Sequence, residues 1–177
     1  MLALLWVAQA CAPVAQTDPF ATLSPVYDPA LVWRAGHENG LRTVVVGSPF
    51  KTNLSDESEK LRPMLRLPPW HQRADFTLVP NAASRRGYRL VLVFNPTAPL
   101  TFGEACKELD HIETSSSTPT VHLHAAFCTG DRPLSEIDGR GGDLQALLDQ
   151  TLARLLTPNN RDNFREGRCA GVFRLCL

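Results

Sequence analysis

The chain of 177 residues lacks an excess of either charge, because 18 Lys and Arg side chains balance 18 Asp and Glu side chains. A neutral chain has no broad positive field, so its composition argues against a nucleic-acid partner. No internal repeat is visible. Hydrophobic residues make up 44% of the chain, a share typical of a globular domain.

The chain also lacks the short motifs that identify several enzyme classes. No C-x-x-C occurs, so we expect neither a thioredoxin-type redox centre nor a zinc ribbon. Gly47-Ser48-Pro49 has no second half of the G-x-S-x-G motif of serine hydrolases. Residues 138–142 are glycine-rich before a predicted helix, but they lack the spacing and the lysine of phosphate-binding loops. The sequence therefore predicts no cofactor and no catalytic set, and favours a non-enzymatic role.

The chain also lacks a hydrophobic run long enough to cross a bilayer as a helix. The one notable shorter run lies at the N-terminus. Residues 2–8 are seven apolar or small residues, which suffice for a short signal-peptide core but not for a helix across a bilayer. Ala8-Gln9-Ala10 then forms the small-x-small pattern that a signal peptidase accepts. Residues 11–25 are rich in Pro, Ala and Thr and predict a flexible tether. We expect a signal peptide over 1–10, this tether, and a single α+β domain over 26–177.

The segment MLALLWVAQAC resembles the lipobox of bacterial lipoproteins, and the chain is similar to small uncharacterised lipoproteins of the bacterial cell envelope. It departs from the usual pattern at Ala8, where a bulky Leu is common, and at Gln9, where a small residue is normal. The resemblance implies lipidation of Cys11 and a membrane anchor through that lipid. It also implies a location in the cell envelope, facing the periplasm or the cell exterior. Two alternatives are a secreted protein cleaved after its leader, and a cytosolic protein whose N-terminus belongs to the core.

The number of cysteines bears on whether the protein is exported. There are five, namely Cys11, Cys106, Cys128, Cys169 and Cys176. An odd number in an exported protein leaves one thiol to explain, and lipidation of Cys11 would remove it. The other four allow three pairings, of which we prefer Cys106 with Cys128 and Cys169 with Cys176. In a cytosolic protein the same four would be buried, reduced thiols.

Hydrophobic periodicity predicts an α+β fold with an antiparallel or mixed sheet of four to six strands. One main amphipathic helix, over about 143–156 with Asp143 as its N-cap, is expected to pack on one face of that sheet. A shorter helix is expected within 53–65. The expected strands are 42–46, 74–79, 88–94, 121–128 and 171–177. We expect 74–79 and 88–94 to form an antiparallel hairpin, and 129–142 to be a long polar loop.

His122 and His124 lie two residues apart on a predicted strand, so both side chains should emerge on one face. Two imidazoles there would supply two ligands of a zinc or copper site, with His111 or Glu113 as the third. The alternative is that both histidines form the solvated face of a half-buried strand.

Two further groups of residues have a functional and a structural interpretation. Cys128 ends the same strand beside His124 and could act as a nucleophile, although an exported thiol is more often in a disulfide. The charges of the long loop, at Asp131, Arg132, Glu136 and Asp138, could form a polar recognition patch, but we expect them to be solvated loop charges.

These patterns favour an exported, lipid-anchored, accessory or structural protein of the bacterial envelope that binds another envelope protein. The alternative function is an envelope metal-binding protein or hydrolase that uses His122 and His124.

Overall fold

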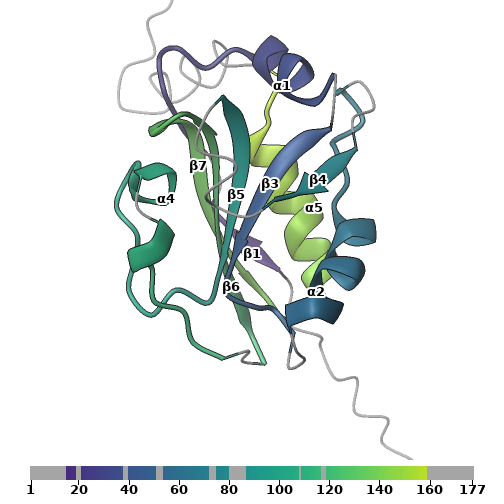
Figure 1. Cartoon of the computed structure of the whole chain (residues 1–177), viewed down its shortest axis with the longest axis vertical. Coiled ribbons are helices and arrows are strands. Elements are labelled where there is room, and N and C mark those ends of the chain that lie inside the picture. Colours follow the sequence, from purple (N-terminus) through teal and green to yellow (C-terminus); the bar gives the residue numbers. More distant parts are fainter. Residues whose placement is uncertain are drawn as a thin grey trace, which may run out of the picture.

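A computed structural model describes residues 15–18, 21–37, 40–50, 54–71, 75–79, 87–107, 109–116 and 119–158, with the side chains of 54–57 left out. They form one mixed sheet of seven strands with helices on both faces, which confirms the α+β class (Figure 1). The expected signal peptide over 1–10, Cys11, Cys169, Cys176 and the expected strand 171–177 lie outside the described residues.

The strands are β1 (Gln16–Thr17), β2 (Thr22–Leu23), β3 (Leu41–Val46), β4 (Phe76–Leu78), β5 (Tyr88–Phe94), β6 (Val121–Thr129) and β7 (Arg132–Gly141). The helices are α1 (Pro29–Gly36), α2 (Leu54–Leu61), α4 (Glu104–Lys107) and α5 (Leu144–Leu155). Two short 3-10 helices are η1 (Arg62–Met64) and η2 (Leu109–His111).

The sheet has the strand order β1-β7-β6-β5-β3-β4, and β2 also pairs with β7. β3 runs parallel to both β4 and β5, whereas β5, β6 and β7 are antiparallel neighbours. The expected hairpin between 74–79 and 88–94 is therefore wrong, because β3 lies between β4 and β5. Residues 47–75, which include α2, make the crossover that parallel pairing of β3 with β4 requires.

β7 occupies most of the segment that was expected to be a polar loop over 129–142. Its glycines suggest a loop, but Gly139 has a packing role instead. A Cβ at Gly139 would lie 2.9 Å from both Leu147 Cδ1 and Thr17 Cγ2. The missing side chain lets α5 and β1 approach the strand closely.

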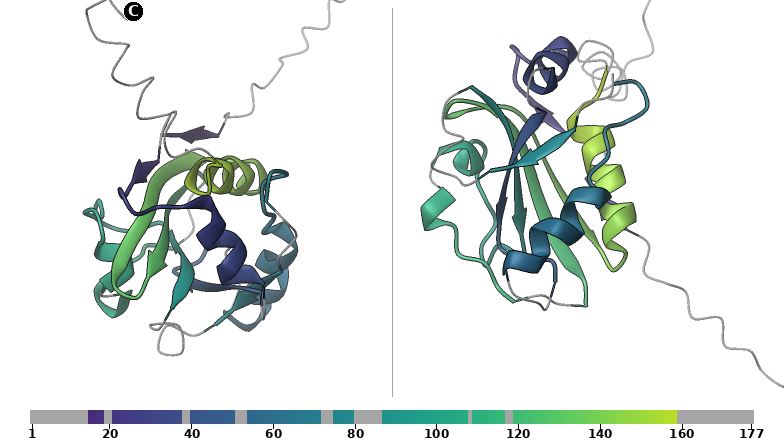
Figure 2. Two further views of the ribbon diagram at one scale, coloured as in Figure 1. Left: turned by 90° about the horizontal axis from the view of Figure 1, so that it is seen from above. Right: turned by 45° about the vertical axis from the view of Figure 1, so that its right-hand side comes forward.

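α5 lies within the range of about 143–156 over which a helix was predicted. The Asp143 carboxylate accepts a hydrogen bond from Ala146 N at 3.1 Å, so it is the N-cap. Leu147, Leu148 and Leu152 are fully buried. They belong to the larger core, which α1, α2 and α5 cover on one face of the sheet, as Figure 2 shows.

Part of the expected tether over 11–25 belongs to the sheet. Gln16 pairs with Arg140, and Thr22 pairs with Glu136. The Arg154 guanidinium of α5 donates to the carbonyl oxygens of Thr17 at 2.8 Å and Asp18 at 2.6 Å. The tether expectation does not hold for these paired residues, because their backbone groups find partners on the edge of β7.

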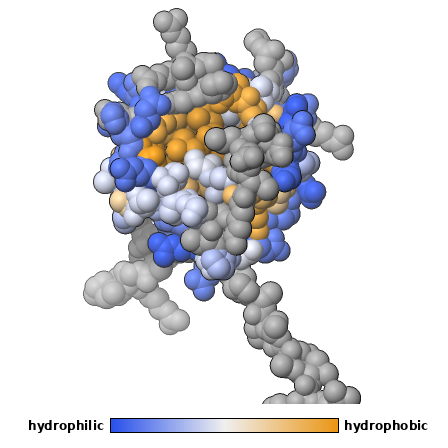
Figure 3. Space-filling view, turned by 60° about the horizontal axis from the view of Figure 1, so that its bottom comes forward, coloured by the Kyte–Doolittle hydropathy of each residue, from blue (hydrophilic) through white to orange (hydrophobic). Residues whose placement is uncertain are grey.

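The opposite face of the sheet carries a smaller core under α4 and η2. Cys106 of α4 and Cys128 of β6 are joined there by a disulfide, and both residues are fully buried. This is the pairing preferred from the sequence. Cover on this face is incomplete, since Val46, Leu100 and Ile112 are only partly buried. Figure 3 shows hydrophobic residues that reach the surface and are bordered by hydrophilic ones.

Candidate functional site

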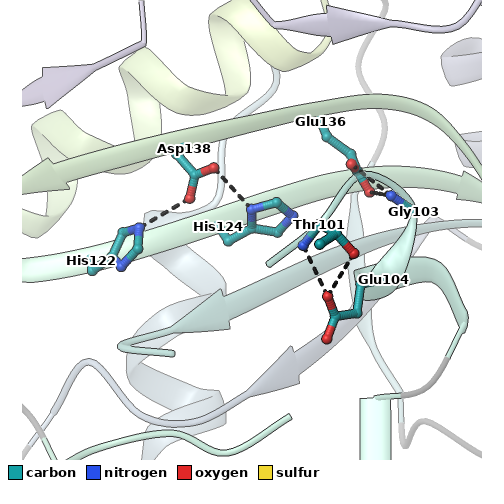
Figure 4. A network of polar contacts seen from close by, with 7 residues as sticks. All are labelled: Thr101, Gly103, Glu104, His122, His124, Glu136 and Asp138. Carbon is teal, nitrogen blue, oxygen red and sulfur yellow. Dashed lines mark hydrogen bonds and ion pairs between the residues drawn. The ribbon is translucent and has the colours of Figure 1, made fainter. Parts of the chain in front are cut away.

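Two histidines of β6 and two carboxylates of β7 project from the same side of the sheet as α4 (Figure 4). The antiparallel register places His124 opposite Asp138, and Ala126 opposite Glu136. Side chains two residues apart share one face of a strand, so His122 joins His124, and Glu136 joins Asp138. The prediction that both imidazoles emerge on one face is confirmed.

Asp138 bridges the two imidazoles. Its Oδ1 lies 3.0 Å from His122 Nε2, and its Oδ2 lies 3.2 Å from His124 Nδ1. An ionised carboxylate only accepts hydrogen bonds, so each of these ring nitrogens donates. The neutral tautomers are thereby fixed, with the lone pair on His122 Nδ1 and on His124 Nε2.

The two lone pairs are in different surroundings. The His122 side chain is 20% exposed, so solvent or a ligand can reach it. The His124 side chain is only 3% exposed, and its Nε2 is buried without a hydrogen-bond partner among the described residues. His122 is therefore the imidazole that is positioned for exchange with a ligand.

The charge state of Asp138 follows from these contacts. Partial burial favours the neutral acid, but the hydrogen bonds from His122 and His124 outweigh it and hold the pKa of the carboxyl well below its usual range. Asp138 is thus an anion at neutral pH, and it orients both imidazole rings.

Glu136 links this cluster to α4. Both of its carboxylate oxygens accept from Gly103 N at 3.0 Å. Burial raises the pKa of Glu136, although the Gly103 hydrogen bond and nearby His124 act in the opposite direction. The Glu104 carboxylate caps the same turn by accepting from Thr101 N at 2.9 Å and Thr101 Oγ1 at 2.8 Å. The Thr101 backbone bond, followed by its side-chain bond, lowers the pKa of Glu104.

Asn95 fixes the start of β6 next to His122. It has a φ of 52°, the left-handed region that Asn tolerates better than most residues. Its Oδ1 accepts from His122 N at 3.0 Å, and its Nδ2 donates to Ser48 O at 3.2 Å. The buried amide therefore ties the ends of β3, β5 and β6 together beside His122.

The other predicted site residues are not brought to this cluster. No group of three or more His, Cys, Asp or Glu side chains within the described ranges has the arrangement of a metal site. His111 on η2 and Glu113 just after it therefore do not supply the expected third ligand. Cys128 is in the disulfide, so the interpretation of it as a nucleophile is wrong.

Sequence reasoning missed Asp138, Glu136 and Asn95 as parts of this site. One signal was available in residues 136–140, where charged side chains at 136, 138 and 140 alternate with Ile137 and Gly139. That period of two is typical of a strand. The proline and glycines around it favoured a loop instead.

Comparison with protein-family models, with curated proteins and with solved structures found no match to this chain. None of the helices in the described part of the chain has the length and apolarity needed to cross a membrane.

Proposed function

We propose that this protein is exported and held at a membrane of the bacterial cell envelope by a lipid on Cys11, where it serves as an accessory protein that binds an envelope partner. The observation that carries the proposal is the disulfide between Cys106 and Cys128. Disulfides form and persist in oxidising compartments and are rare in the cytosol of mesophiles.

The position of this disulfide supports a structural role. It joins α4 to the central strand β6, and both cysteines have no exposed surface. A redox-active or regulatory disulfide needs access for an attacking thiolate. A buried bond that holds one layer of the fold to the sheet is instead typical of a protein that matures where thiols are oxidised.

The start of the described chain supports attachment close to a membrane. Ala15 is 8% exposed and packs beside Gly141, because a Cβ on Gly141 would lie 3.0 Å from Ala15 Cβ. Three residues separate Ala15 from Cys11, so the two Cα atoms are four chain steps apart and can lie at most about 14 Å from each other. A lipid on Cys11 would therefore keep this end of the sheet at the membrane surface. More than one acyl chain is needed for durable anchoring.

Exposed apolar side chains at the other end of the sheet support a protein partner. Val26 is 70% exposed and Trp33 of α1 is 43% exposed. α1 leads into the start of β3, which lies at the end of the sheet opposite the end of β7. In the anchored protein these two residues would lie at the end of the sheet that is farther from the membrane.

The experiment compares the parent chain with Cys11→Ala in a bacterial host supplied with radiolabelled palmitate. Val14→Ala is the matched control, because it alters the same segment and keeps the sulfur. The parent and the control should carry label and sediment with membranes. Cys11→Ala should carry no label. Equal labelling of all three chains, or no labelling of the parent, would contradict the proposal.

A second candidate function is a hydrolase that uses His122 as a general base. The observation that favours it is the Asp138–His122 pair, in which the carboxylate fixes the tautomer and leaves Nδ1 as a proton acceptor. p-Nitrophenyl acetate tests this function. His122→Ala and Asp138→Asn should each lose most of the hydrolysis that the parent shows, whereas His37→Ala should keep it. Equal rates for all four chains would dispose of this candidate.

A further inference from the structure

We infer that a groove between η1 and β4 binds a small amphipathic anion, meaning a single carboxylate or phosphate head on an apolar chain. The groove has a volume of about 730 Å³ and opens to solvent. It is lined by residues 62–63, 65–69, 71 and 75–76. It lies on the face of the sheet that carries the larger core, opposite the face with α4 and the histidine–carboxylate cluster. The inference does not depend on the anchor at Cys11.

One wall of the groove is held at both ends by side chains that bond to backbone carbonyls. Gln145 Nε2 of α5 donates to Met64 O at 3.0 Å. At the other end, Trp70 Nε1 and His71 Nε2 donate to Leu156 O at 3.1 and 2.7 Å. Residues 64–71 are therefore fixed along α5 at two points.

Prolines stiffen the same wall. Pro63, Pro68 and Pro69 all line the groove, and each fixes its own φ near −65°. A wall with so little backbone freedom loses little entropy when a ligand binds. The groove is thus formed before a ligand arrives.

The floor and the rim of the groove differ in chemistry. Leu65 and Phe76 belong to the main core at 6% and 4% exposure, and they give the floor an apolar surface. Arg62 and Arg66 are exposed and line the same groove. Neither guanidinium forms an ion pair or a side-chain hydrogen bond with another described residue, so both can bind a ligand.

The charges select the class of ligand. Among the described residues that line the groove, Asp75 is the one acidic residue, against the two arginines Arg62 and Arg66. The excess positive charge favours an anionic head, which guanidinium groups bind through charge-assisted hydrogen bonds. The apolar floor favours an aliphatic body. A volume of about 730 Å³ lies within the range of about 300–1,000 Å³ that is usual for small-molecule sites.

Isothermal titration calorimetry of the full chain with decanoate tests this inference, with decyl phosphate as a second anionic probe. Decan-1-ol and decyltrimethylammonium have the same apolar chain without the negative charge. We expect saturable binding of at least one anion with a Kd below about 1 mM. We expect the alcohol and the cation to bind at least tenfold more weakly. Binding of only one anion would identify which head the arginines accept.

The variant Arg62→Gln with Arg66→Gln tests whether the anion binds in the groove. Both positions are exposed, so the variant should fold like the parent. It should bind the preferred anion at least tenfold more weakly. Arg34→Gln is the matched control, because Arg34 is an exposed arginine of α1 outside the groove, and it should bind like the parent. Absence of saturable binding, equal affinity for decan-1-ol, or unchanged affinity of the double variant would each overturn the inference.

Discussion

Loss of the Cys106–Cys128 disulfide should strongly reduce the stability of this fold. The two cysteines are 22 residues apart in sequence. In the chain-entropy model, a loop of that length restricts the unfolded chain by about 11 cal/mol/K, which is about 3.4 kcal/mol at 25 °C. The variant Cys106→Ala with Cys128→Ala also removes two fully buried sulfur atoms, at a cost of about 1 kcal/mol each. We therefore expect a total loss of about 5 kcal/mol.

Urea unfolding followed by circular dichroism measures both contributions. In oxidising buffer, the double variant should lose about 5 kcal/mol of unfolding free energy relative to the parent. With a reductant that opens the bond, the parent should lose the loop contribution alone, about 3.4 kcal/mol. A parent whose stability is the same in both buffers, with the bond intact in one and reduced in the other, would refute the chain-entropy reasoning.

Three further predictions concern single positions. Gly139→Ala should cost about 1–3 kcal/mol in thermal unfolding, because the new Cβ would lie 2.9 Å from Leu147 Cδ1; a cost near zero would contradict the close packing of α5 on β7. Asn95→Ala should cost about 2–4 kcal/mol, because it removes two hydrogen bonds at a φ of 52°, whereas Asn95→Gly should recover the backbone part of that loss. Asp138→Asn should cost about 1 kcal/mol at pH 7, since the carboxylate is partly exposed. Because the folded pKa of Asp138 lies below its ordinary 3.8, this stabilisation is present above pH 4 and is lost as the pH falls further; a cost that stays constant down to pH 2 would contradict the bridge.

The elements that the sequence predicted well depend on local patterns. The apolar run at 88–94 gave the bounds of β5, and leucine spacing with an Asp cap gave α5. Both signals lie within a dozen residues, where helix and strand periodicities are visible. The preference for Cys106 with Cys128 also agreed with the structure, because few pairings compete among so few cysteines.

The parts that escaped prediction depend on contacts between distant segments. The place of β3 between β4 and β5 is set by the crossover through α2, which spacing along the chain does not show. In the sequence, Gly139 is typical of a loop. Its packing role depends on α5, which lies against it in the fold. Asp138 became a site residue only through its register with His124, which is a property of strand pairing and not of the segment itself.

The most direct test of the account is the intact mass of the protein purified from the membranes of a bacterial host, combined with sequencing of its N-terminal peptide. The account predicts a chain that begins at Cys11, carries the added mass of a diacylglyceryl group on that sulfur, and retains the disulfide between Cys106 and Cys128. A chain that retains residues 1–10, or an unmodified Cys11 thiol at the start of the mature chain, would contradict it.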